Sequence, residues 1–381
     1  MTARRPIGVR WIAWQPGDGF GEAAQSYIAA LDRLGVPVTW TPLEWVEGDP
    51  QMRVAADYRG PLAHLAGRQI DHDTLVVHIP PGDDRWLADA GDRRTAIYTT
   101  WESDRVPDGW LPSLERFDVV LVPSTFNARA LLDAGCRATV HVAPHIVERP
   151  ADVAPARFER IGDRYVFYVI ATWSTRKAMA DTVCAFLDAF DDRNDVALVV
   201  KTTADDAWAV AQARRGRVVD TRVWPRFAAL VAGRRHVPEI QLIPGPIPAA
   251  DVAALHARGN CFFSLTRSEG WGLCISDALA FGNPVIVTGW GGHLDYLGTD
   301  YPLLIDYDLV PTTNDPPDDW FDAGPGHRWA KARHDHAVDL LRWVAANPER
   351  ASAIAAPLRE RLVRECAPDV IGRRLIETLA G

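Results

Sequence analysis

The sequence predicts an α/β protein made of two doubly wound domains, each with a parallel sheet covered by helices on both faces. Three observations lead to this prediction. The chain has 381 residues, more than a single hydrophobic core usually supports. Short apolar β-prone runs alternate with helical patterns, and such alternation favours parallel sheets. A stretch rich in proline and charge, residues 148–155, interrupts the alternation and has the composition of a linker between domains.

The first series of elements lies before this linker. Residues 9–15 form an apolar strand pattern, a glycine-containing loop follows at 16–21, and residues 22–34 have a helical pattern. Further strands are expected at 74–79, 95–98, 119–122 and 139–142, with a helix at 126–134. We therefore place a first domain at residues 1–150.

A second series follows the linker and indicates a second domain at residues 151–365. Its expected strands are 165–171, 196–201, 240–243, 261–265 and 284–288, and its expected helices are 179–190, 249–258 and 273–281. Residues 204–238 interrupt this series with Trp208, Trp224 and many arginines, and we interpret them as a helical insertion whose sequence indicates no function. In open α/β sheets ligands bind where the carboxyl ends of strands lead into helices, so we expect the site there.

Composition and charge exclude several classes of protein. The formal net charge of -9 lacks the basic balance of a nucleic-acid-binding surface. The five cysteines are odd in number and have no C-x-x-C or metal-ligand spacing, which favours a reducing, cytoplasmic location. Residues 1–10 lack the apolar core of a signal peptide, and no apolar run reaches membrane-spanning length. Any contact with a membrane is therefore expected to be peripheral.

The most informative stretch is residues 264–287, in which an apolar strand leads into a loop with two glycines and then a helix. Gly270 and Gly272 allow a ligand to approach the backbone, and free N–H groups at a helix start bind anions. Glu269 lies in the loop, whereas Asp277 lies about one turn inside the helix, so the two carboxylates can reach different parts of one ligand. The structural alternative is that Glu269 charges the helix start and Asp277 lies on a solvated face.

The order of these residues resembles the signature of retaining GT-B glycosyltransferases, in particular those similar to glycosyltransferase family 4. That signature has a glutamate, seven residues, a second acid, an Ala-Leu-Ala segment, a turn ending in Pro-Val-Ile, and a glycine pair, here Gly291 and Gly292. The second acid is usually glutamate, and Asp277 is one methylene shorter. The resemblance implies two Rossmann-like domains facing across a cleft, with the acceptor on the first and the nucleotide-sugar donor on the second. It also implies that a last helix, residues 366–381, packs back on the first domain.

A basic pair upstream matches the donor side of the same family. Arg176 and Lys177 follow the first strand of the second domain, where the family has a basic residue and a lysine that neutralise the donor diphosphate. Residues 171–172 are Ala-Thr where the family has Gly-Arg, so one phosphate contact is missing or is supplied by Arg176 or Lys201. The resemblance implies Glu269 and Lys177 as catalytic residues. It implies donor contacts from Arg176, Lys177, Lys201, Gly270, Trp271, Gly272, Leu273 and Asp277.

The first domain carries weaker matches to the acceptor side of the family. Gly19, Phe20 and Gly21 resemble the loop that closes on donor phosphate and acceptor, although an ordinary tight strand-to-helix connection has the same composition. Acceptor contacts are expected from His78, Trp101, Glu102, Arg105 and His145. A lone histidine more often makes a structural hydrogen bond than takes part in catalysis, so both histidines keep that alternative.

These observations predict an enzyme that moves a hexosyl group from a nucleotide-diphosphate sugar to an acceptor with retention of anomeric configuration. UDP or GDP is the expected nucleotide, and the acceptor is a glycan, a lipid-linked molecule or a small molecule. No Asp-x-Asp motif follows an expected strand, so the enzyme is expected to need no metal and no cofactor. The alternatives are a nucleotide-sugar-binding pseudoenzyme and another enzyme on the same fold, such as an epimerase or a phosphorylase.

Overall fold

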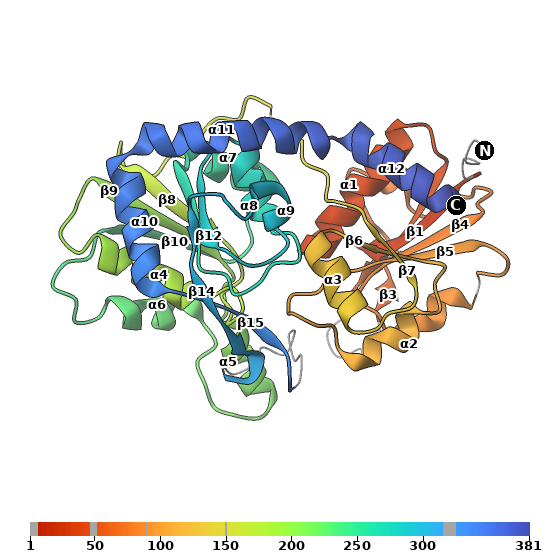
Figure 1. The fold of residues 1–381 in the computed structure, drawn as a ribbon, viewed down its shortest axis with the longest axis horizontal. Coiled ribbons are helices and arrows are strands. Elements are labelled where there is room, and N and C mark those ends of the chain that lie inside the picture. Colours follow the sequence, from red (N-terminus) through yellow and green to blue (C-terminus); the bar gives the residue numbers. More distant parts are fainter. Residues whose placement is uncertain (1–6, 46–51, 89, 149–150, 315–324) are drawn as a thin grey trace. The chain divides into compact units, whose positions relative to one another are not determined.

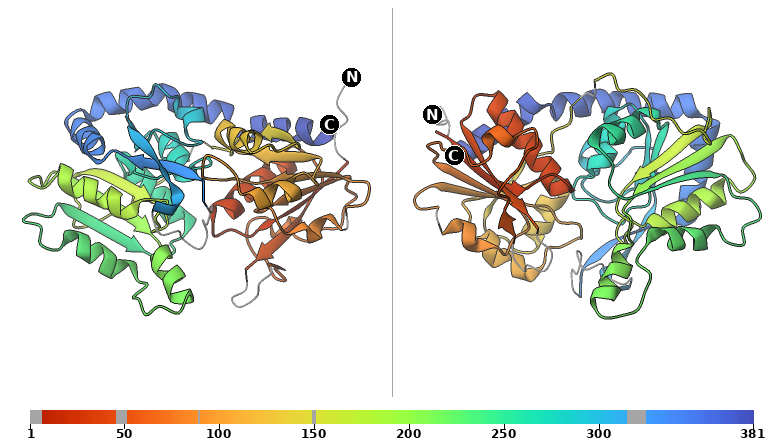
Figure 2. Two further views of the ribbon diagram at one scale, coloured as in Figure 1. Left: turned by 60° about the horizontal axis from the view of Figure 1, so that its bottom comes forward. Right: turned by 180° about the vertical axis from the view of Figure 1, so that it is seen from behind.

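The chain divides into two compact units, each built around a parallel sheet (Figure 1), which confirms the predicted fold class. The computed structural model describes residues 7–45, 52–88, 90–148, 151–314 and 325–381, so residues 1–6 and residues 149–150 of the predicted linker lie outside it. The first unit contains Met1–Trp101, Arg105–Glu148 and Val363–Gly381, and the second contains Glu102–Asp104 and Arg149–Leu362. Figure 2 shows the ribbon from two further sides.

The first unit has a seven-stranded sheet in the order β3-β2-β1-β4-β5-β6-β7. Its pairs are parallel except for β2 with β3. The strands are β1 Val9–Trp14, β2 Val38–Glu44, β3 Arg53–Val54, β4 Thr74–His78, β5 Arg94–Tyr98, β6 Val119–Val122 and β7 Thr139–Val142. β2 was not predicted, because Pro42 and two threonines break its apolar run; pairing with β1 nevertheless buries most of it.

Helices cover this sheet, and the last helix of the chain is among them. They are α1 Gly19–Arg33, α2 Leu111–Leu114, α3 Thr125–Asp133 and α12 Pro368–Ala380, with 3-10 turns η1 Ala63–Leu65, η2 Asp84–Leu87 and η3 Asp108–Trp110. α12 packs beside α1 (Figure 1). Gly372 permits this close approach, because a Cβ there would lie 2.6 Å from the Leu34 side chain.

An aromatic core holds the first unit together. Trp11 and Tyr27 are fully buried, and their rings stack with centroids 5.9 Å apart. From α12, Ile371, Leu375 and Leu379 point into the same core at a spacing of four residues, which places them on one helix face. The burial of this apolar face holds the C-terminal helix against the first unit.

The second unit has a six-stranded, wholly parallel sheet in the order β10-β9-β8-β11-β12-β13. Its strands are β8 Tyr165–Ile170, β9 Val196–Thr202, β10 Glu239–Pro244, β11 Cys261–Ser264, β12 Val285–Thr288 and β13 Leu304–Ile305, and a separate antiparallel hairpin consists of β14 Tyr307–Pro311 and β15 Arg328–Ala332. Three strands were not predicted: β13, which has two residues, the largely exposed β14, and its partner β15. Because β11 lies between β8 and β12, its carboxyl end opens onto the middle of the ligand-binding edge.

The helices of the second unit connect these strands. They are α4 Met179–Ala189, α5 Ala207–Arg214, α6 Val223–Val231, α7 Ala249–Arg258, α8 Leu273–Ala280, α9 Leu294–Leu297, α10 His334–Ala346 and α11 Pro348–Glu365, with a 3-10 turn η4 Thr312–Asn314. The predicted insertion at 204–238 contains α5 and α6 between β9 and β10. α11 extends from the second unit into the residues assigned to the first.

Candidate functional site

The loop after β11 lies at the carboxyl edge of the second sheet. β11 is buried throughout, and both neighbouring strands run in the same direction. Residues 265–272 leave this strand and lead into α8, and every one of them is buried. Most loops lie on the surface, because buried backbone and side-chain polar groups need partners. The partners of this loop therefore define the site.

Glu269 is the charged centre of the loop. Its carboxylate oxygens accept hydrogen bonds from Nζ of Lys177 at 2.6 and 2.7 Å and from Oγ1 of Thr266 at 2.9 Å. Nη1 of Arg176 lies 3.7 Å from one of them. Burial acts to raise the pKa of the Glu269 carboxyl, but the charges of Lys177 and Arg176 outweigh it and hold that pKa below its usual value. Glu269 is therefore ionised and fixed in place at neutral pH.

Arg176 and Lys177 come from the loop between β8 and α4, beside the Glu269 loop. The guanidinium of Arg176 also donates to the backbone oxygen of Ser268 at 2.8 Å, which joins the two loops. The carboxylate of Glu102, in the short segment that belongs to the second unit, lies 3.2 Å from Arg176. The structure thus brings together Arg176, Lys177 and Glu269, and it places Glu102, expected on the acceptor side, next to them.

The glycine pair of the signature packs against the backbone of Glu269. The N–H of Gly292 donates to the backbone oxygen of Glu269 at 2.7 Å. Gly291 has a φ of 133°, and a Cβ there would lie 2.9 Å from the same oxygen. Both its backbone conformation and the space around it therefore require glycine. These contacts hold the position of the Glu269 carboxylate.

Two helices begin at this edge without a side-chain cap. Gly272, with a φ of 86°, is the N-cap of α8, and Ala178, with a φ of 48°, is the N-cap of α4. Ala178 is the one non-glycine residue of the described chain with a positive φ, a strained conformation that is often found at functional sites. Helix N-termini without a side-chain cap attract anions. α4 begins directly after Lys177, so a lysine and a helix start act on the same region.

Trp271 lies between the loop glycines but is buried, with 3% of its surface exposed. Its ring packs on Tyr296 with centroids 4.7 Å apart, and its indole N–H donates to Oγ of Ser276 at 3.2 Å. The Tyr296 hydroxyl in turn donates to the backbone oxygens of Trp271 and Gly272 at 3.1 and 3.2 Å. The indole therefore braces the loop.

Cys274, in the first turn of α8, lies among the charged groups of the site. Burial raises the pKa of this thiol to about 12, and the charge of Asp277 raises it further. The charged groups acting on the thiol are Asp277, Lys177, Glu269 and Lys201. Asp277 is half-buried in α8, and Leu273 is half-buried at its start. The charges of both acids of the signature thus act on the same thiol, although Glu269 lies in the loop and Asp277 lies in α8.

Lys201 lies near the end of β9, opposite Ile170 of β8 in the parallel pairing. Its ammonium donates to the backbone oxygen of Thr202 at 3.2 Å, and burial lowers the pKa of the amine. The residue is half-buried. The structure therefore places a third basic side chain at the edge that carries Lys177.

The N-terminal glycine loop of the first unit already holds a carboxylate. Gly19, Phe20 and Gly21 form the first turn of α1, and Asp18 caps it by accepting from the N–H of Gly21 at 2.8 Å. Burial raises the pKa of Asp18, although hydrogen bonds from Gly21 and Phe20 oppose the rise. A Cβ on Gly21 would lie 2.3 Å from the backbone oxygen of Gln15. Close packing thus explains this glycine, and the side chain of Asp18 caps the helix start.

His78 and His145 lie inside the aromatic core of the first unit. Nδ1 of His145 is 2.9 Å from the Tyr27 hydroxyl, and burial lowers the pKa of His145 to about 3. His78 ends β4, is 1% exposed, and lies against Phe20 and Tyr98. Burial lowers its pKa well below the usual value, and within the described residues its Nδ1 has no hydrogen-bond partner. Both histidines are therefore neutral, and His145 makes the structural hydrogen bond of the alternative interpretation.

Trp101 and Arg105 form a local turn in the first unit. The indole N–H of Trp101 donates to the backbone oxygen of Arg105 at 2.6 Å, and its backbone N–H donates to Oδ1 of Asn127 at 2.9 Å. The Arg105 guanidinium lies 3.2 Å from the Asp108 carboxylate. Trp101 is largely buried, with 8% of its surface exposed. Of the five residues expected on the acceptor side, Glu102 alone is assigned to the second unit.

Some residues of the site gave a weak signal in the sequence. Thr266 was not selected, although a hydroxyl three residues before the signature glutamate is well placed to hydrogen-bond to it. An Asp-x-Asp pattern, Asp306 to Asp308, does follow β13, a strand that had not been predicted. Its members already have partners, since Asp308 pairs with Arg333 at 2.9 Å and Asp306 with His336 at 3.3 Å.

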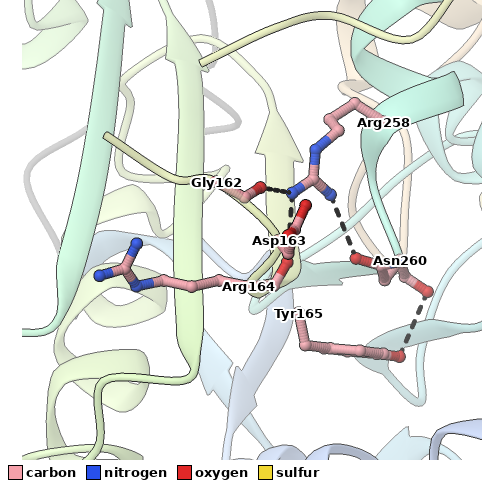
Figure 3. A pocket seen from close by; sticks show the side chains of 6 residues that line it. All are labelled: Gly162, Asp163, Arg164, Tyr165, Arg258 and Asn260. Atoms are coloured by element: carbon pink, nitrogen blue, oxygen red, sulfur yellow. Dashed lines mark hydrogen bonds between the residues drawn. The ribbon is translucent and has the colours of Figure 1, made fainter. Parts of the chain in front are cut away.

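A pocket lies beside the amino ends of β8 and β11, away from the Glu269 loop (Figure 3). Arg258 donates to the backbone oxygens of Gly162 and Arg164 at 2.8 and 3.2 Å. The Arg164 side chain points away from Arg258 and donates to the backbone oxygen of Asn194 at 2.6 Å. Because both guanidinium groups are bound to carbonyl groups, they crosslink the chain here.

The described part of the chain has neither a membrane-spanning helix nor a cluster of metal ligands. None of its helices is both long and apolar enough to cross a membrane. Among the same residues, no group of three or more histidine, cysteine, aspartate or glutamate side chains is placed to hold a metal ion.

Comparison with solved structures identifies the fold as GT-B. No protein-family model and no curated protein matches the sequence. An α,α-trehalose-phosphate synthase (UDP-forming) from Burkholderia xenovorans, solved with glucose-6-phosphate, matches with a TM-score of 0.68 and 14% identity, covering 98% of this chain and 100% of that one. HepE from Anabaena, solved with UDP and glucose, matches with a TM-score of 0.62 and 12% identity, covering 98% and 100%. A glycosyltransferase from Rickettsia africae matches with a TM-score of 0.64 and 11% identity, covering 98% and 97%.

Proposed function

We propose that this chain is a glycosyltransferase that moves a hexosyl group from a nucleotide-diphosphate sugar to an acceptor with retention of anomeric configuration. The observation that carries the proposal is the Lys177–Glu269 pair at the carboxyl edge of the second sheet, beside two helix starts without a side-chain cap. Basic side chains next to such helix starts suit a diphosphate, and a fixed carboxylate suits sugar hydroxyls.

The leaving diphosphate is the group that needs most stabilisation in this reaction. As the bond between the anomeric carbon and the phosphate oxygen breaks, negative charge grows on the β-phosphate. In the proposal, Lys177, Arg176 and the N–H groups at the start of α8 lie where they stabilise this charge. Positive groups held in place before the reaction are effective because they need little rearrangement.

Glu269 and Asp277 take different parts of the donor in this proposal. Glu269 is fixed by Lys177 and Thr266, so it can accept hydrogen bonds from sugar hydroxyls in a defined direction. Asp277 lies further along α8 and accepts from the ribose hydroxyls. A diphosphate offers Lys177 a second anion, so donor binding loosens its pairing with Glu269 and makes that carboxylate available to the sugar.

Three finer points of the proposal have separate support. Retention rests on the resemblance of the signature to that of retaining enzymes. UDP is favoured over GDP because HepE was solved with UDP and the Burkholderia synthase is described as UDP-forming. Metal independence rests on Lys177, Arg176 and Lys201 as the positive charges near the proposed diphosphate.

The test is a donor and acceptor screen with product analysis. UDP, GDP, ADP and TDP sugars are first ranked by thermal shift, because a ligand that binds the folded state stabilises it. The best donor is then mixed with sugar, sugar-phosphate and lipid-linked acceptors, and NMR identifies the anomer formed, with and without EDTA. We expect nucleotide release, one retained product and little effect of EDTA. An inverted product, a Mg-restored loss of activity, an epimerised donor, or binding without transfer or hydrolysis would each contradict a stated part of the proposal.

A further inference from the structure

The insertion between β9 and β10 has a charge unlike that of the rest of the chain. Residues 204–238 contain seven arginines and three aspartates, with no lysine or glutamate, in a protein of formal net charge -9. From residue 207 to residue 238 the one acidic residue is Asp220. The segment is therefore a local concentration of positive charge on an acidic protein.

The turn between α5 and α6 is the most exposed part of this segment. Residues 213–218 are all exposed, and they include Arg214, Arg215 and Arg217. Val218 follows the last of these arginines, and its side chain is fully exposed. Three cationic side chains and an apolar one are thus presented together at this turn.

The helix that follows exposes apolar residues as well. α6 buries Val223 and Phe227, which are four residues apart and face the interior. Trp224 is 59% exposed, and Ala228, one turn further along the same face, is also exposed. The outward face of a surface helix is normally polar. Contiguous apolar patches rimmed by polar residues mark interaction sites, and Pro225 and Ala229, which neighbour Trp224 and Ala228 on α6, are exposed as well.

An ion pair and a hydrogen bond hold the segment together, and a backbone hydrogen bond joins it to the loop after β8. Figure 1 shows α5 and α6 within the second unit. Asp206 caps α5 by accepting from the N–H of Trp208 at 3.0 Å, and Arg226 of α6 lies 3.3 Å from the same carboxylate. The N–H of Ala207 donates to the backbone oxygen of Trp173 at 2.9 Å. The exposed turn and Trp224 are therefore carried on a folded support.

We propose that the α5–α6 segment docks on membranes whose surface carries anionic lipids. Arginines near such a surface are attracted by its negative potential, and this attraction complements the charge of the segment. Tryptophan prefers the headgroup region, where its ring is in an apolar layer and its N–H is in water. A soluble polyanion would use the arginines and could stack a base or a sugar on Trp224, but it would have no use for the fully exposed aliphatic side chain of Val218. The combination therefore favours a lipid surface, and this inference is independent of the proposed function.

The experiment measures binding of the full chain to vesicles by co-sedimentation. Vesicles of phosphatidylcholine alone are compared with vesicles that also contain phosphatidylglycerol, at low and high salt. We expect binding to the anionic vesicles that weakens with salt. Replacement of Arg214, Arg215 and Arg217 by glutamine should lower the partition coefficient on the order of a hundredfold, because each arginine contributes about fivefold near an anionic surface. Trp224→Ser should weaken vesicle binding on its own.

Matched variants separate the segment from general charge and general hydrophobicity. Arg59, Arg68 and Arg157 are exposed arginines outside it, and replacing them by glutamine removes the same charge. Trp45 is 58% exposed, nearly the same fraction as Trp224, so Trp45→Ser is the control for the change at Trp224. We expect these controls to bind vesicles like the wild type, with unchanged thermal unfolding in every variant. Equal binding to both vesicle types, no binding to either, or an equal loss in the controls would overturn the proposal. The proposal would also be overturned by retention on heparin that falls when the three arginines are replaced, is unchanged in Trp224→Ser, and is accompanied by no vesicle binding. That result indicates a soluble polyanion.

Discussion

The ammonium of Lys177 and the carboxylate of Glu269 form a two-point ion pair across 92 positions of sequence, with nitrogen–oxygen distances of 2.6 and 2.7 Å. Both side chains are mostly buried, with exposed fractions of 18% and 10%. Removing one partner leaves the charge of the other buried and less well paired. A change at either residue is therefore expected to affect the stability of the second unit, and a change at Lys177 is expected to affect the binding of a donor as well.

Lys177→Ala should weaken donor binding and slow transfer together. A lysine facing a diphosphate acts on the bound donor and on the transition state, and a charge-assisted contact is worth about 1.5–3 kcal/mol. We expect kcat/KM to fall by roughly tenfold to somewhat over a hundredfold. The control is Lys331→Ala, which removes an exposed lysine of β15. Unchanged KM and kcat in Lys177→Ala would remove this residue from the site.

Changes at Glu269 and Asp277 should have different effects on binding and turnover. Glu269→Gln should mainly lower kcat, on the order of a hundredfold, because it removes the carboxylate charge that is held in place against the sugar. It should leave the affinity for the bare nucleotide diphosphate almost unchanged. Asp277→Ala should weaken diphosphate and full donor alike, by about 1.5–3 kcal/mol, and Asp277→Glu should be tolerated. Calorimetry and steady-state kinetics separate these effects, and the reverse pattern would show that the two roles are misassigned.

The acid stability of the protein should depend on Glu269. Its pKa is below the usual value when folded, because Lys177 and Arg176 outweigh the effect of burial. The stabilisation is therefore complete above the unfolded pKa of about 4.3 and is lost as pH falls through the folded pKa. Urea unfolding of the wild type and Glu269→Gln should differ by about 1–3 kcal/mol at pH 7, and this difference should shrink below about pH 4. A difference that grows on acidification would contradict the prediction.

Gly291→Ala should lower activity more than its effect on stability explains. The new methyl group meets the backbone oxygen of Glu269 at 2.9 Å, so it displaces the carboxylate. Gly282→Ala is the matched control, because Gly282 also has a positive φ, 95°, but its nearest neighbour is the flexible end of Arg359 at 3.6 Å. Both changes should destabilise the fold by about 1–2 kcal/mol from backbone strain. Transfer assays below the melting temperature should show a loss in Gly291→Ala alone.

Ala178→Gly should stabilise the protein by about 0.5–1 kcal/mol. Ala178 has a φ of 48°, a conformation that costs an L residue energy and costs glycine little. Ala180→Gly, two residues further in the same helix, should instead destabilise by about 1 kcal/mol, because glycine is unfavourable inside a helix. Chemical denaturation of both variants gives the comparison. A loss of stability in Ala178→Gly equal to that in Ala180→Gly would show that the residue carries no strain.

The sequence by itself determined the fold class and the loops that carry the site. Two series of apolar strand patterns predicted the parallel sheets, because a strand buried on both faces needs a continuous apolar run. The signature around Glu269, and the basic pair at Arg176 and Lys177, were recognised because spacing within a single loop or turn is visible in sequence. Elements without such a pattern were missed: β2 contains Pro42, and β13 has two residues.

Tertiary structure alone decided which side chains of those loops meet and which are buried. The Lys177–Glu269 pair depends on β8 and β11 being neighbours in the sheet, a relation between distant segments. Trp271 was expected to contact the donor, and the structure packs its buried indole on Tyr296, 25 positions away; its contact with a donor stays a prediction. Asp18 occupies the start of α1, and burial in an aromatic core makes His78 and His145 neutral. Burial and charge depend on every element packed around a group, and a local pattern of residues does not contain that information.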